Sequence, residues 1–161
     1  MHGLTYLSLE GTRVTGPGLA HLGGLPLATL SLAHTPIDDA GLAHLDALPV
    51  LTTLDLQGTR VTGPGLAHLA RLRRLTRLDL DDTPLDDQAL RFLADLRVTD
   101  LFLSGTAVSD AGLADLARML YVHRVTLCRT QVTEDAAART RFRTRGLCVM
   151  PEGAPAPTPG R

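Results

Sequence analysis

The sequence lacks lysine, asparagine and tryptophan, and it contains only two cysteines among its 161 residues. So few cysteines exclude a disulfide framework. No stretch approaches the roughly 18 apolar residues of a membrane span. The first residues show no basic segment followed by an apolar one, so we expect no signal peptide and a cytoplasmic protein. The net charge of −1 excludes a general electrostatic attraction to nucleic acid or membranes.

The missing residue types follow a coding preference. All sixteen basic residues are arginine and Ile37 is the only isoleucine, whereas alanine, glycine, leucine and proline are abundant. Codons rich in G and C favour this composition, which indicates a bacterial genome of high GC content.

What the sequence does contain is a repeated unit, seen most clearly over residues 51–74, LTTLDLQGTRVTGPGLAHLARLRR. The pattern returns after every 23 or 24 residues. Its copies, repeats 1 to 6, begin at Leu4, Leu27, Leu51, Leu75, Val98 and Val122. Because periods of about 20–50 residues are typical of solenoids, nearly the whole chain is predicted to be one stacked array.

Each repeat combines a strand with a short helix. In repeat 3, Leu54 and Leu56 flank the polar Asp55, which is the alternation of a half-buried strand. Leu66 and Leu69 follow three residues apart, as expected for one stripe of a short helix. One such unit cannot bury its apolar faces alone, whereas stacked copies can. We therefore predict an α/β solenoid with a parallel sheet on its concave side and short helices on its convex side.

The junction between strand and helix has residues suited to turns and caps. Position 12 of every repeat can accept a hydrogen bond from a helix N–H, and position 15 is always glycine or alanine, which indicates a close approach of backbones. Position 9 is threonine in all six repeats: Thr12, Thr35, Thr59, Thr83, Thr106 and Thr130. We predict that these hydroxyls satisfy the backbone of neighbouring turns rather than bind a ligand.

The L-x-x-L-x-L opening and the period of the unit resemble the leucine-rich repeat family. The segments DAGLAHL (39–45), DAGLADL (110–116) and GPGLAHLA (63–70) resemble a bacterial subgroup that includes GALA-type effectors and cysteine-containing repeats. The resemblance implies a protein-binding function on the concave sheet, without a cofactor. Threonine at position 9, where the family has Asn or Cys, is a departure. No residues remain for the F-box of some relatives, so their link to ubiquitin ligases does not carry over.

The array has a longer internal period and an open edge. Residues 11–22 and 58–69 are identical, and repeats 2 and 4 share the variant T-P-[IL]-D-D, so a pair of repeats is predicted to be the unit of duplication. Leu4, Leu7 and Leu9 would form a bare edge in repeat 1, because terminal repeats normally need a polar outer face. We expect this edge to be covered, for example by self-association, or to continue into a longer array.

The repeat pattern decays toward the C-terminus. Residues 146–150 are predicted to form a last edge strand, which gives a repeat domain over residues 1–150. The proline-rich segment 151–161 is predicted to be a disordered tail. With Cys128 in repeat 6 and Cys148 in the predicted edge strand, an offset of four residues, ~13 Å, predicts that the two cysteines do not pair.

The candidate binding surface is the concave face, onto which positions 3, 5, 7 and 8 should project. Acidic residues gather there in the middle of the array beside Phe102, and an aromatic side chain flanked by charges is typical of an interaction hot spot. The predicted partner-binding residues are Tyr6, Asp55, Arg77, Asp79, Asp81, Asp100, Phe102 and Arg124. The alternative is a solvated sheet face without a ligand.

Other chemistries find little support. Residues 79–87 lack the glycine and terminal glutamate of a calcium-binding loop, so no metal site is predicted. Ser31, His34 and Asp55 would lie on a shallow sheet without an oxyanion donor, so we predict that the protein is not an enzyme. The alternating arginines of residues 139–145 surround a single aromatic residue, so no nucleic-acid partner is predicted.

Two functions therefore remain open from the sequence. The first is a non-catalytic module that binds a protein partner through the concave face. The second is a structural or accessory segment of a longer repeat protein, with no ligand of its own.

Overall fold

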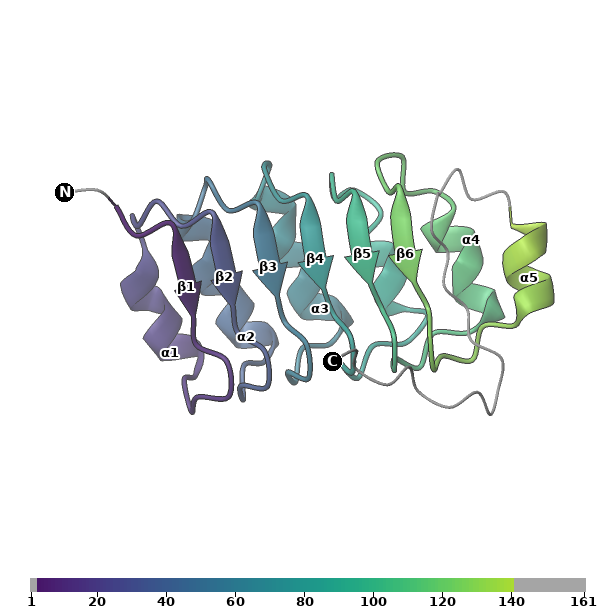
Figure 1. Ribbon diagram of the computed structural model, residues 1–161, viewed down its shortest axis with the longest axis horizontal. Helices are drawn as coiled ribbons and strands as arrows, with labels where there is room; N and C mark the ends of the chain where they lie inside the picture. The colour runs from purple at the N-terminus through teal and green to yellow at the C-terminus, as the bar shows by residue number, and fades with distance from the viewer. Residues whose placement is uncertain (1–2, 141–161) are drawn as a thin grey trace, which may run out of the picture.

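The computed structural model describes residues 3–140, in which six repeats stack side by side (Figure 1). Each repeat contributes one strand: β1 (Tyr6–Ser8), β2 (Thr29–Ser31), β3 (Thr53–Asp55), β4 (Arg77–Asp79), β5 (Asp100–Phe102) and β6 (Arg124–Thr126). Neighbouring strands pair in parallel and follow one another across the sheet in chain order. The predicted edge strand over 146–150 and the predicted tail over 151–161 lie outside the described residues.

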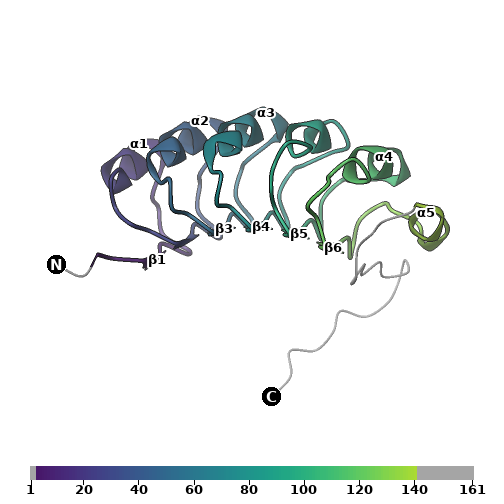
Figure 2. The ribbon, with the colours of Figure 1, turned by 90° about the horizontal axis from the view of Figure 1, so that it is seen from above.

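Short helical segments return the chain from one strand to the next. They are α1 (Gly16–Leu19), η1 (Ala20–Leu22), α2 (Asp39–Leu42), η2 (Ala43–Ala47), α3 (Gly63–Leu66), η3 (Ala67–Arg71), η4 (Ala89–Phe92), η5 (Asp110–Gly112), α4 (Leu113–Leu116) and α5 (Glu134–Arg139). Figure 2 shows the strands along the inner side of the arc and the helices along its outer side. The predicted solenoid, with its sheet on the concave side, is confirmed.

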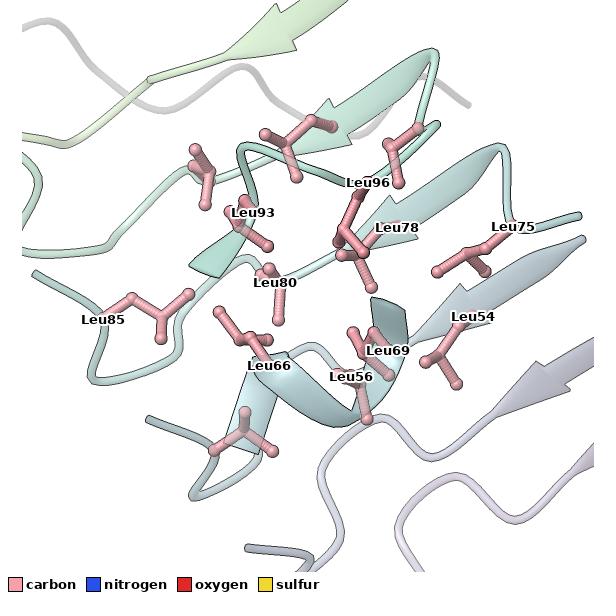
Figure 3. Close-up of a cluster of buried hydrophobic side chains, with 14 of the residues drawn as sticks. Leu54, Leu56, Leu66, Leu69, Leu75, Leu78, Leu80, Leu85, Leu93 and Leu96 are labelled. Atoms are coloured by element: carbon pink, nitrogen blue, oxygen red, sulfur yellow. The ribbon is translucent and has the colours of Figure 1, made fainter. Parts of the chain in front are cut away.

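The core is a continuous layer of leucines between the sheet and the helices. Leu54 and Leu56 point inward from repeat 3, and Leu66 and Leu69 meet them from the helical side (Figure 3). All four side chains are completely buried. Because each repeat packs mainly on its two neighbours, burial is complete in the middle of the array and falls at its first repeat, where Leu4 is 48% exposed.

The threonines at position 9 brace the turn that follows each strand. Thr35 and Thr59 are buried, and their hydroxyls donate to the carbonyl oxygens of Leu32 and Leu56 at 2.6 and 2.7 Å. Each acceptor lies three residues earlier in the same turn, not in a neighbouring turn as predicted. The predicted structural function of these hydroxyls is confirmed, with this change of acceptor.

The residue at position 12 caps the helix in some repeats only. The Asp38 carboxylate accepts from the Gly41 N–H at 3.2 Å, and the Thr133 hydroxyl accepts from the Ala136 N–H at 3.2 Å. Thr15 and Thr62 make no side-chain cap, so the prediction of a cap in every repeat is wrong. The hydroxyl of Thr62 instead donates to an aspartate of the preceding repeat.

That bond belongs to an inter-repeat contact that we call the aspartate bridge. Asp39, at position 13 of repeat 2, accepts from the backbone N–H of Thr62 at 2.7 Å with one oxygen and from the Thr62 hydroxyl with the other. The same pair of bonds joins Asp87 to Ser109 and Asp110 to Thr133. Each bridge satisfies an N–H that precedes a helix and ties two repeats together.

Repeats 1 and 3 have glycine at position 13 and use a different contact. A Cβ on Gly63 would lie 2.9 Å from the Cα of Ala89, so the two backbones touch where a side chain cannot fit. At the aspartate bridge the crowding shifts to position 15, because a Cβ on Gly65 would lie 2.3 Å from Oδ1 of Asp39. In repeats 1 to 4 the two contacts alternate, which explains why the sequence repeats most closely in pairs.

One cysteine contradicts the sequence-based expectation. Cys128 is part of a disulfide bond, so the prediction that the two cysteines do not pair is wrong. The predicted separation assumed that residues 146–150 extend the sheet in register. The other cysteine of the chain, Cys148, lies outside the described residues.

Candidate functional site

The strand register places the predicted binding residues, except Asp81 in the turn after β4, in two rows across the concave sheet. Tyr6, Arg77, Asp100 and Arg124 lie in the row formed by position 3, in which neighbouring strands pair directly. A second row, formed by position 5, contains in order Ser8, Ser31, Asp55, Asp79, Phe102 and Thr126. Between the rows, the position 4 side chains point into the core. The alternation read from the sequence therefore identifies the residues that line this face.

A shallow pocket of about 220 Å³ lies on this face between β1 and β4. The aromatic ring of Tyr6 and the carboxyl group of Glu10 line one end, and Arg77 lines the other. Asp55 and Asp79 lie next to each other on its floor, on the paired strands β3 and β4. The pocket therefore combines neighbouring carboxylates with an exposed aromatic side chain, since Tyr6 is 61% exposed.

The two floor carboxylates are held by hydrogen bonds and not by ion pairs. Asp55 accepts from the Ser31 hydroxyl at 3.1 Å and from the Gln57 N–H at 3.0 Å. Asp79 accepts from the Asp81 N–H at 3.1 Å. Within residues 3–140, no cation lies within ion-pair distance of either carboxylate.

The pKa of Asp79 is raised from 3.8 to about 6, and burial is the largest cause. The negative charges of Asp81 and Asp55 contribute to the rise, whereas the Asp81 N–H and the nearby Arg77 guanidinium oppose it. Burial likewise raises the pKa of Asp81, against the opposing effect of the hydrogen bond from the Ser104 N–H. The ionised form of Asp79 is therefore held at a free-energy cost that a bound cation would reduce.

Replacing Asp79 by asparagine should stabilise the fold at neutral pH. Because the pKa of Asp79 is higher in the folded than in the unfolded state, ionisation of this residue lowers the free energy of unfolding as pH rises from about 4 through 6. Asparagine does not ionise, so it avoids this loss, and its side-chain oxygen can still accept from the Asp81 N–H. Allowing for solvent screening at this half-buried site, we expect Asp79→Asn to raise the free energy of unfolding by about 1 kcal/mol at pH 7 and by almost nothing at pH 4. Urea unfolding at the two pH values measures the difference, and equal effects at both would contradict the assignment.

Phe102 is not the bare aromatic ring that the sequence predicts. The guanidinium of Arg77, on the adjacent strand, lies over its face at 4.3 Å from the ring centroid, and the ring is half-buried. The stacked Arg77 makes no ion pair with Asp79 on the same strand, although it lies close enough to lower the pKa of Asp79. Asp100 is also engaged, because it pairs with Arg124 at 3.5 Å.

Position 8, which the sequence places on the concave face, forms a rim whose left-handed backbone was not predicted. Glycine occupies it in repeats 1, 3 and 5, whereas His34, Asp82 and Arg129 adopt the same left-handed backbone, each with φ of 56°. That conformation costs a non-glycine residue about 1 kcal/mol. Asp82 and Arg129 pair at 2.9 Å across the intervening Gly105, so the rim joins alternate repeats. The alternation of glycine and larger residues at position 8 is the sequence signal that could have predicted this left-handed backbone.

The alternative chemistries gain nothing from the geometry. The Ser31 hydroxyl bonds directly to Asp55, so His34 does not stand between them as a catalytic base would. No group of histidine, cysteine or acidic side chains in the described part of the chain could hold a metal ion. Nor is any helix there long and apolar enough to cross a bilayer.

Comparisons with known proteins agree with the repeat pattern. The family model described as "Leucine Rich repeat" matches residues 47–70. No curated protein matches the chain by sequence. The matched model describes the repeat in general, and the resemblance to the GALA-type subgroup stays a prediction.

Solved structures show the same architecture at low sequence identity. Internalin C2 from Listeria monocytogenes is 21% identical over 91% of this chain and 80% of its own, with a TM-score of 0.52. Internalin F from the same organism is 19% identical, with a TM-score of 0.50, over 89% of this chain and 54% of its own. A chain of the mouse RP105/MD-1 complex is 17% identical, with a TM-score of 0.66, over 81% of this chain and 22% of its own.

At this level of identity the solved structures show only that this protein shares their fold. One repeat of this protein, residues 47–70, also matches the family model. Such arrays are typical protein–protein interaction modules. The motif, the stacked strands and helices and the match over residues 47–70 agree, and the chain has the fold of a leucine-rich repeat solenoid.

Proposed function

We propose that the protein is a non-catalytic module that binds a protein partner through the concave face. The proposed contact residues are the predicted set: Tyr6, Asp55, Arg77, Asp79, Asp81, Asp100, Phe102 and Arg124. The observation that carries the proposal is the pocket between β1 and β4, where two neighbouring carboxylates are half-buried and, among the described residues, make no ion pair.

The chemistry of the pocket defines the part of the partner that it would take. A lysine or arginine side chain entering between Tyr6 and Arg77 would meet the carboxylates of Asp55 and Asp79 and place its aliphatic stem against the tyrosine ring. Because the carboxylates are partly desolvated before binding, little further desolvation opposes the contact. The stacked Arg77 and Phe102 continue the surface toward β5 and offer a flat apolar contact.

A peptide-display selection on the immobilised chain tests this proposal. We expect the selected peptides to contain a basic residue and to bind 10–100-fold more weakly to the double variant Asp55→Asn, Asp79→Asn, because loss of the charged contact with both carboxylates weakens binding by about 1–3 kcal/mol in total. The matched control is Asp95→Asn, an exposed aspartate in the connection between η4 and β5.

The pH dependence gives an independent check with a defined sign. With a pKa of about 6, Asp79 becomes neutral as pH falls below that value, so the affinity for a basic peptide should decrease between pH 7 and pH 5. Peptides without basic residues, or affinities that the double variant leaves unchanged, would contradict the proposal.

A second candidate function, an accessory segment of a longer repeat array, is favoured by the outer face of repeat 1. Leu4 is 48% exposed there, beside the half-buried Leu7 and Leu9. This function does not compete with partner binding, because it uses the edge of β1 and not the concave face.

A further inference from the structure

The outer face of repeat 1 has an internal duplicate whose covering is visible. Residues 11–22 of repeat 1 and 58–69 of repeat 3 are identical in sequence, and position 2 is threonine in both. In repeat 3 this face packs on repeat 2, whereas in repeat 1 no described residue packs on it. What covers the face of repeat 3 therefore shows which neighbour the face of repeat 1 fits.

The apolar part of the face is buried in one copy and open in the other. Val61 and Leu69 are completely buried in repeat 3, whereas their counterparts Val14 and Leu22 are only partly buried. The contrast is larger at position 1, where Leu51 is 0% exposed and Leu4 is 48% exposed. The face of repeat 1 thus lacks an apolar neighbour of the size of one repeat.

The polar part of the face specifies more than a generic neighbour. In repeat 3 the backbone N–H groups of Thr52 and Arg60 donate to carbonyl oxygens of repeat 2, both at 2.8 Å, and the N–H of Thr62 donates to Asp39 at 2.7 Å. The corresponding N–H groups of repeat 1 belong to Thr5, Arg13 and Thr15. Among residues 3–140 none of these three has a hydrogen-bond acceptor.

Glycine at position 15 adds the most specific requirement. Gly65 must lack a side chain because Asp39 fills the space where its Cβ would lie, at 2.3 Å from Oδ1 and 2.7 Å from Cα. At Gly18 the same Cβ would meet only the side chain of Val14 in its own repeat, at 2.9 Å. Gly18 and the unbonded Thr15 therefore reproduce one half of an aspartate bridge whose acidic half is missing from the described residues.

We propose that the outer face of repeat 1 is a docking site for one further leucine-rich repeat with aspartate at position 13, the class to which residues 27–50 belong. Its carbonyl groups would accept from Thr5 and Arg13, and its aspartate would accept from the N–H and hydroxyl of Thr15. A repeat with glycine at position 13 fits less well, because it leaves Thr15 without an acceptor. This site is separate from the concave face and does not depend on the proposed partner binding.

The test adds the neighbour to the full chain. A copy of residues 27–50 is inserted between Gly3 and Leu4, which places it in the register that repeat 2 has with repeat 3. We expect the insertion to raise the Tm by about 5 °C or more, because it buries Leu4 and satisfies three N–H groups. Hydrogen exchange at the Thr15 N–H should slow by about 100-fold.

Three matched variants separate the aspartate bridge from generic stacking. The inserted repeat with alanine in place of its position 13 aspartate, and an insertion copied from residues 51–74, should both leave the Thr15 N–H in fast exchange. Gly18→Ala should lower the Tm of the extended chain by several degrees more than that of the original chain, since only the extended chain has an aspartate against that Cβ.

Two results would overturn the proposal. One is equal stabilisation and equal protection of Thr15 by the aspartate and glycine classes of insertion. The other is a dimer of the original chain in light scattering that Leu4→Arg dissociates, because the face would then serve contact between two copies of the chain.

Discussion

Replacing Leu78 by alanine should lower the free energy of unfolding by about 3–5 kcal/mol, the largest loss that we expect from one leucine. Leu78 lies in the middle strand β4, is completely buried and packs among leucines of the sheet and the helices (Figure 3). Truncation removes its apolar contacts and leaves a cavity that rigid neighbours on both sides cannot fill. Urea unfolding followed by circular dichroism measures the loss.

The matched control is Leu7→Ala, which removes the same atoms from the same position of repeat 1. Leu7 pairs with Leu30 on one side only and is partly exposed, so we expect a loss of about 1 kcal/mol. Leu78→Met, which nearly conserves volume, should cost less than about 1.5 kcal/mol. Equal losses for Leu7→Ala and Leu78→Ala would contradict a solenoid stabilised by contacts between nearest neighbours.

The sequence was sufficient to predict this fold because the same spacing of apolar residues recurs in every repeat. Leu54, Leu78 and Leu101 face the core, and Asp55 and Asp79 face the concave surface, because the period of two admits one assignment of each face. The prediction of the two rows on the sheet needed no knowledge of distances. The binding function of those rows stays a prediction.

What the sequence did not predict depends on contacts between particular side chains. The stack of Arg77 on Phe102 requires one rotamer among several, and a reader of the sequence would as readily pair Arg77 with Asp79. The disulfide of Cys128 was missed because the separation predicted from strand spacing, ~13 Å, exceeded the reach of a disulfide.

The aspartate bridge was predicted only in part. The sequence showed the aspartates that form it, but not the contact that they make with the next repeat. The doublet Asp38-Asp39 and its counterpart Asp86-Asp87 were recognised as a shared variant of repeats 2 and 4. The first aspartate of each doublet acts within its own helix, as predicted. The second reaches across to the next repeat, and local pattern reasoning considers only neighbours along the chain.

Removing the Asp39 carboxylate should therefore cost more than removing that of Asp38, although the two residues are adjacent. Asp39→Ala leaves the N–H and hydroxyl of Thr62 without their acceptor at a partly buried interface, so we expect a loss of about 2–3 kcal/mol. Asp38→Ala removes only the cap on the Gly41 N–H and should cost about 1 kcal/mol. Asp39→Asn keeps one acceptor oxygen and should fall between them.

Hydrogen exchange locates the loss in the interface and not in the helix. In Asp39→Ala the Thr62 N–H should lose protection while the Gly41 N–H keeps it. In Asp38→Ala the Thr62 N–H should keep its protection and the Gly41 N–H should lose only part of it, because it also donates to the Asp38 carbonyl oxygen at 3.0 Å. Equal unfolding energies for the two alanine variants, or loss of protection at Gly41 in both, would mean that Asp39 acts only as part of its own helix. The class-specific docking proposed for repeat 1 would then lose its physical basis, because Asp39 is the partner that it copies.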